Sequence, residues 1–182
     1  MRSHSSLHGV GTVDLLIKNG LIITMDKDRR IITDGSVAID GGRIISVKRG
    51  RAGRGKSEKV IDARGKIIMP GLICSHTHLH GLFLHSTQLK IEPPSDLVQI
   101  QQRAHWPVEE TITKDDAYAG ALFSCLQFLK TGVTLFAGTI SGPNLMPGVL
   151  DKVALAVERS KIRGIIAFEA TERRTHAEGA KG

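Results

Sequence analysis

The sequence predicts an α/β protein in which a β-rich segment precedes a parallel sheet. Residues 1–65 contain short apolar runs punctuated by glycine dipeptides, whereas residues 66–182 alternate strand, helix, strand, helix and strand. Such alternation is typical of parallel strands joined by crossover helices. Apolar residues make up 41% and charged residues 24%, which excludes disordered and collagen-like chains. We therefore expect two domains, 1–65 and 66–182.

The first segment is expected to form a small β domain or part of one. Asn19-Gly20 and Gly41-Gly42 each separate two short apolar runs. Both dipeptides suit a type I′ turn, because its two central residues need positive φ angles. Each therefore predicts a hairpin.

The second segment begins after Pro70 and contains both local helix signals and apolar strands. Thr113, with Asp116 three residues later, predicts the N-cap of a helix that ends at Gly132. Pro147 opens a second helix. Leu72–His76 is expected to be a buried strand, and the lack of polar alternation in Val133–Ala137 predicts a strand whose two faces are both covered. The predicted strands are Leu72–His76, Val133–Ala137 and Arg163–Phe168.

The net charge of +7 arises in one place. Residues 43–66 carry nine Lys or Arg against Glu58 and Asp62, so the excess of seven lies there. The stretch 48–59 interleaves these charges with glycine and has no aromatic residue, which favours a solvated connection over a phosphate-binding loop. Aromatic residues are only 4% of the chain. We therefore expect no nucleic-acid partner.

The composition also bears on the compartment. No apolar run reaches the 18 or so residues of a membrane helix, and the N-terminus has no signal-peptide pattern. Cys74 and Cys125 are too few for a disulfide framework. These features predict a cytoplasmic protein with no membrane partner.

The stretch SHTHLHG carries the strongest chemical signal. His76, His78 and His80 lie at i, i+2 and i+4, so they would share one face of an extended strand. Neighbouring neutral imidazoles can bind one metal ion, and such a triple is expected only about 0.015 times by chance. The competing interpretation is a surface cluster that binds metal opportunistically. His80 would be either a third ligand or a loop residue near substrate.

Two segments resemble a known family. DLLIKNGLIITMD followed by VIDARGKIIMPGLICSHTHLH is similar to the opening of the amidohydrolase superfamily. HWPVEETITKDDAYAGALFSCLQFLKTGVTLFAG is similar to its cytosine deaminase-like and chlorohydrolase branch, so the chain resembles the N-terminal portion of that branch. The resemblance implies part of a β-sandwich followed by about the first three units of a (β/α)8 barrel, which is incomplete.

The resemblance also implies a function. It points to a metal-dependent hydrolase of non-peptide C–N bonds that deaminates an amino-substituted nitrogen heterocycle by metal-hydroxide attack. His76 and His78 would bind one divalent ion, zinc first and iron or manganese as alternatives. His80 and Glu169 are candidates for substrate contact. The partner would be a small heterocycle, and a homo-oligomer is possible.

Several residues depart from the family pattern. Cys74 stands where many relatives have Asp, and we expect it to be a small buried side chain on the same face as His76. Gly138 stands where the branch often has Asp, so no support for the ligands is expected there. His105, in a loop, and His176 are not expected to be ligands.

The remaining ligands and the catalytic Glu and Asp are expected beyond Gly182, so no catalytic residue is assigned. Glu169 and Glu172 are expected to be solvated or paired with Arg173 or Arg174. The alternative function is therefore a catalytically incomplete segment that acts as an association or complementation module.

Overall fold

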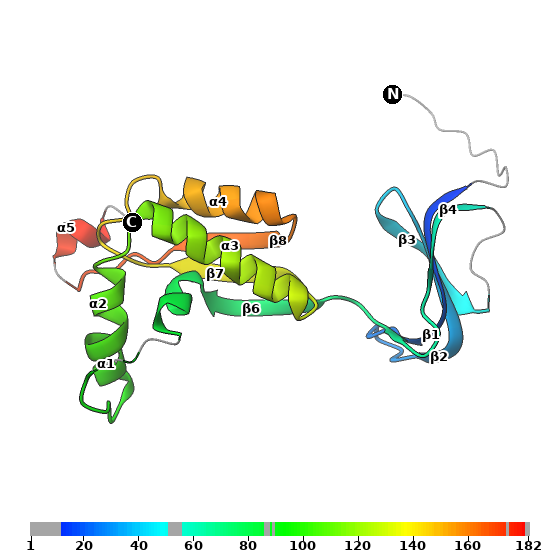
Figure 1. Ribbon diagram of the computed structural model, residues 1–182, viewed down its shortest axis with the longest axis horizontal. Helices are drawn as coiled ribbons and strands as arrows, with labels where there is room; N and C mark the ends of the chain where they lie inside the picture. The colour runs from blue at the N-terminus through cyan, green and yellow to red at the C-terminus, as the bar shows by residue number, and fades with distance from the viewer. Residues whose placement is uncertain (1–11, 51–55, 86–87, 89, 174, 181–182) are drawn as a thin grey trace. The chain divides into compact units, whose positions relative to one another are not determined.

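The computed structural model describes residues 12–50, 56–85, 88, 90–173 and 175–180 (Figure 1). Contacts divide the chain into two units, Met1–Pro70 and Gly71–Gly182. Residues 51–55, in the predicted basic connection, lie outside the described ranges. Among the described residues, no helix is both long and apolar enough to span a bilayer.

The first unit is a mixed β-sheet. Its strands lie in the order β3-β2-β1-β4, and β5 also pairs with β1. The turn predicted at Gly41-Gly42 is confirmed, because both residues have positive φ and Asp40 pairs with Arg43 across the antiparallel β2–β3 ladder. The strands are β1 (Val13–Ile23), β2 (Ile31–Asp40), β3 (Arg43–Arg49), β4 (Ser57–Asp62) and β5 (Ile67–Ile68).

The hairpin predicted at Asn19-Gly20 is wrong, because β1 runs straight through it. β4 pairs in parallel with the first half of β1 and β5 with the second half, while β2 pairs with both halves. The dipeptide lies instead at an irregularity in the β1–β2 register, where Asn19 has a φ of 64°. The Asn19 side chain donates to Asp62 Oδ1 at 2.9 Å. The left-handed conformation is used inside a strand rather than in a turn.

The second unit is a parallel sheet in the order β6-β7-β8, which confirms the α/β prediction. The strands are β6 (Leu72–His78), β7 (Val133–Ile140) and β8 (Arg163–Phe168). Two long helices, α3 (Lys114–Lys130) and α4 (Val149–Ser160), lie side by side over one face of the sheet (Figure 1). The shorter helical segments are η1 (Leu79–Leu84), α1 (Leu97–Ile100), η2 (Gln101–His105), α2 (Trp106–Glu109) and α5 (His176–Gly179).

The predicted start of α3 is confirmed. The Thr113 hydroxyl accepts from the Asp116 backbone N–H at 3.2 Å, and the Thr113 backbone N–H donates to the Asp116 carboxylate at 2.8 Å. This reciprocal capping box satisfies two N–H groups that a helix end leaves unpaired. Gly132, with a φ of 83°, follows the end of α3, as expected for a helix stop.

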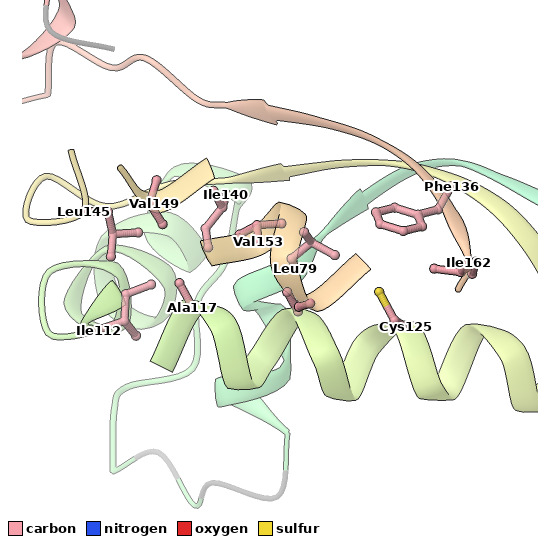
Figure 2. Close-up of a cluster of buried hydrophobic side chains, with 12 residues drawn as sticks. Leu79, Ile112, Ala117, Cys125, Phe136, Ile140, Leu145, Val149, Val153 and Ile162 are labelled. Atoms are coloured by element: carbon pink, nitrogen blue, oxygen red, sulfur yellow. The ribbon is translucent and has the colours of Figure 1, made fainter. Parts of the chain in front are cut away.

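The main core lies between the sheet and the helices α3 and α4 (Figure 2). Phe136 and Ile140 of β7 are fully buried in it, whereas the alternate residues of that strand are half-buried. On the opposite sheet face, Ile73 and Ile165 are 66% and 65% exposed. The expected burial of Leu72–His76 is therefore wrong. The residues of β7 on this face, for whose strand two covered faces are predicted, are half-buried.

We expect the Phe136→Ala variant to lose about 3–5 kcal/mol of unfolding free energy, because it removes a fully buried aromatic ring and leaves a cavity. Urea unfolding followed by circular dichroism measures the loss. Phe123→Ala is the matched control, since Phe123 is 44% exposed. Equal losses in the two variants would contradict the assigned core.

Candidate metal centre and the buried polar cluster

An irregularity in β6 decides which side chains face the core. Cys74 pairs with Phe136, but Thr77 pairs with Gly138, so β6 has one more residue than β7 between these pairs. An extra residue of this kind is a β-bulge, and it reverses the usual alternation of faces. Cys74 packs against the core, and the Thr77 methyl lies 3.1 Å from where a Cβ at Gly138 would be. Both side chains therefore face the helices.

His76 and His78 consequently lie on the opposite, open face of the sheet. Their rings meet edge to face, with centroids 4.9 Å apart. The expectation that Cys74 shares a face with His76 is wrong because of the bulge. The Cys74 thiol instead donates to the His76 carbonyl at 3.5 Å. The side chain packs against the core but is half-buried, not fully buried as expected. The bulge thus separates the thiol from the imidazole pair.

His80 does not lie on the strand, because β6 ends at His78 and the chain turns into η1. The predicted single face for all three histidines is therefore wrong. The His80 ring is buried, its centroid is 5.5 Å from that of His78, and its Nε2 lies 3.0 Å from Glu109 Oε1. His80 belongs to a buried polar cluster beside the imidazole pair.

The Nδ1 atom of His78 lies near one side chain of β7 and one from the residue that follows β8. Thr139 Oγ1 lies 3.2 Å from His78 Nδ1, and Glu169 Oε2 lies 3.7 Å from the same atom. Partial burial and the nearby charge of His80 lower the pKa of His78, and Glu169 opposes this shift only in part. A lowered pKa favours the neutral imidazole, which is the form that binds metals.

The acidic residues that follow β8 do not pair as expected. Glu172 contacts His176 at 2.6 Å, Glu169 lies beside His78, and Arg173 reaches Glu109. The expected pairing of Glu169 or Glu172 with Arg173 is therefore wrong. Arg174, the other expected partner, lies outside the described residues.

Glu109 is the centre of the buried polar cluster, which we define as His80, Glu109, Ser141 and Arg173. Its Oε2 accepts from Arg173 Nη2 at 2.5 Å and from Ser141 Oγ at 3.0 Å. Burial tends to raise the pKa of Glu109, but hydrogen bonds from His80 and Arg173 outweigh it and lower this pKa to about 2. The carboxylate is therefore ionised at neutral pH and compensates the buried guanidinium.

Arg173 also lies against an aromatic ring. Its Cζ is 5.5 Å from the Trp106 ring centroid, a cation–π distance. His80 Nδ1, Arg173 Nε and Arg173 Nη1 are buried without a hydrogen-bond partner in the described part of the chain. Sequence reasoning missed Glu109, Ser141 and Arg173 as cluster members, because each comes from a different loop or helix end.

A second group of metal donors overlaps this cluster. Donor atoms of His80, His105 and Glu109 all lie within 4.8 Å of one another. His105 was expected in a loop, but it ends the π-helical turn η2, which continues into α2. His105 and Glu109 are therefore four residues apart on one helical face, a spacing that the sequence does contain. Two imidazoles and a carboxylate suit zinc.

Comparison with known proteins identifies the family of this chain. The model of the amidohydrolase family matches residues 67–181. The chain belongs to the amidohydrolase family. The 5'-deoxyadenosine deaminase of Methanosarcina mazei is 32% identical over 159 residues, which are 87% of this chain and 34% of that protein. This chain thus spans about a third of the length of the curated relatives it matches.

Other amidohydrolase relatives agree. The 5-methylthioadenosine/S-adenosylhomocysteine deaminase of Pelotomaculum thermopropionicum is 32% identical over 156 residues, which are 85% of this chain and 34% of that protein. The atrazine chlorohydrolase of Arthrobacter aurescens, solved with zinc, has a TM-score of 0.68 at 27% identity, and the match covers 85% of this chain and 35% of that one. The predicted family and the predicted incomplete-barrel fold class are confirmed.

The donors of this amidohydrolase chain fit a divalent metal ion. His76 and His78 present two adjacent imidazoles, and imidazole nitrogen is a preferred ligand of zinc. The second group adds a carboxylate that is ionised at neutral pH. The sequence alone indicated His76 and His78. The second group could not be predicted from the sequence, because only the folded chain brings His80 next to α2.

We expect acid to break the buried cluster as Glu109 gains a proton. A pKa lowered from 4.5 to about 2 means that the ionised carboxylate stabilises the fold above its unfolded pKa. That contribution, about 3 kcal/mol at most, is lost as the pH falls from about 5 to about 2. Urea unfolding at several pH values measures it, with Trp106, the single tryptophan, as the fluorescent probe.

The Glu109→Gln variant should be less stable than the parent at neutral pH and should lose much of this acid dependence. Glu110→Gln is the matched control, since Glu110 is the exposed neighbour. The role of Glu109 would be refuted if both variants kept the acid dependence of the parent.

Proposed function

We propose that the protein is a metal-dependent hydrolase that deaminates an amino-substituted nitrogen heterocycle. The observation that carries the proposal is the pair of imidazoles from His76 and His78, whose ring centroids lie 4.9 Å apart at the carboxyl end of β6. The carboxyl ends of parallel strands are where barrel enzymes hold their sites. In this proposal both histidines bind the metal ion.

Zinc is the metal we propose first. Imidazole also suits iron and manganese, so the donors alone do not choose among them. Support for zinc comes from the related atrazine chlorohydrolase, which was solved with zinc. A bound divalent ion lowers the pKa of water from 15.7 to about 7 and so supplies a nucleophile at neutral pH.

The chain's own residues would hold and orient the reactants around that ion. Glu169, half-exposed beside His78, is placed to accept a hydrogen bond from substrate or water. His80 is buried with its Nε2 held by Glu109, so in this proposal it supports the site rather than contacts the substrate. In the overall reaction a C–O bond forms at the ring carbon, its C–N bond breaks, and ammonia leaves.

The substrate class to test first is that of 6-aminopurine nucleosides. The relatives from Methanosarcina mazei and Pelotomaculum thermopropionicum are named as deaminases of 5'-deoxyadenosine and of 5-methylthioadenosine and S-adenosylhomocysteine. The triazine hydrolase neighbours make amino-substituted triazines the second class.

The test is the His76→Ala, His78→Ala double variant. We expect it to lose bound zinc, measured by elemental analysis, and to release no ammonia from these heterocycles, because the ion has lost its two strand ligands. The matched control is His176→Ala, since the His176 side chain is 93% exposed. Unchanged zinc content and ammonia release in the double variant would rule out the proposed site.

A further inference from the structure

We propose that the Thr139 hydroxyl orients the His78 imidazole for metal binding, an inference that rests on the proposed ligand role of His78. Thr139 and His78 are register partners in the parallel β6–β7 ladder, and the Thr139 Oγ1 to His78 Nδ1 distance is 3.2 Å. Metal-binding histidines are commonly fixed by a hydrogen bond to the second ring nitrogen. Thr139 is therefore a positioning residue.

The neighbouring carboxylate decides where the imidazole proton lies. Glu169 Oε2 is 3.7 Å from His78 Nδ1, and a carboxylate only accepts hydrogen bonds. The proton is therefore favoured on Nδ1, which donates it to the Thr139 hydroxyl oxygen. This tautomer leaves the lone pair on Nε2, which is then free to bind the metal.

The packing of β7 explains why this support comes from position 139 rather than 138. A Cβ at Gly138 would lie 3.1 Å from the Thr77 methyl and 3.2 Å from the Phe136 ring, on the helix side of the sheet. A longer side chain there would press into the core. The next residue along the strand faces the other way, toward His78. In this proposal the support that Gly138 cannot give comes from Thr139.

The test compares Thr139→Val, which removes the hydroxyl at nearly constant shape, with the parent chain. We expect zinc affinity, measured by competition with a chromophoric chelator, to fall about tenfold. Thr139→Ser keeps the hydroxyl and should stay within about twofold of the parent. Thr134→Val makes the same change at an exposed position of β7 and should leave the affinity unchanged.

A second readout needs no metal. Long-range 1H–15N spectra of the metal-free chain report which nitrogen of each imidazole carries the proton. We expect the Nδ1–H fraction of His78 to fall in Thr139→Val and to recover in Thr139→Ser, while the His76 ring serves as the internal reference. A purely structural role for Thr139 would not move this signal.

The outcomes separate this inference from the proposed function. If the parent binds zinc through His76 and His78 but Thr139→Val keeps both its affinity and its tautomer, the positioning role is overturned alone. If the His76→Ala, His78→Ala variant binds zinc like the parent, the proposed site itself fails. If Thr139→Val does not fold, Thr139→Ala and Thr139→Ser differ only by the hydroxyl, and equal affinities in that pair would overturn the role.

Discussion

The arrangement of the site depends on one extra residue in β6. Without the bulge between Cys74 and Thr77, strict alternation would place Cys74, His76 and His78 on the same face. If Cys74 faced the core, both imidazoles would then face the core as well. Their ring nitrogens would lose their hydrogen bonds to water, which costs free energy. The bulge allows Cys74 to pack beneath the helices while both imidazoles reach the open face. The bulge thus allows one strand to bury an apolar side chain on one face and to present polar side chains on the other.

The buried polar cluster meets a second constraint, the cost of burying charge. Glu109 and Arg173 come from α2 and from the segment after β8, and neither charge would be stable alone in this environment. Ser141 and His80 supply the remaining hydrogen bonds to the carboxylate. Since these groups follow three different strands and a helix, the cluster ties together the loops at the carboxyl edge of the sheet.

Local signals in the sequence predicted local structure well. The Thr113 capping box and the Gly41-Gly42 turn depend on neighbours within a few residues, and both are confirmed. The Asn19-Gly20 turn failed because strands from beyond residue 56 pair with β1 and keep it extended. The contact between Arg173 and Glu109 spans 64 residues, and no local pattern encodes it. A bulge leaves the apolar pattern almost unchanged, so the faces of Cys74 and His76 could not be read from it.

Electrostatics favours the imidazole pair over the second donor group as the place for the metal. An ion bound by His80, His105 and Glu109 would share that carboxylate with the Arg173 guanidinium, whose Nη2 lies 2.5 Å from Oε2. Two cations on one buried carboxylate repel strongly, because screening there is weak. His78 instead has a carboxylate that no cation shares among the described contacts: Glu169 Oε2 lies 3.7 Å from its Nδ1. The negative charge of Glu169 would stabilise a positive ion bound at Nε2 of His78. The same carboxylate therefore favours both the proton on Nδ1 and the ion on Nε2.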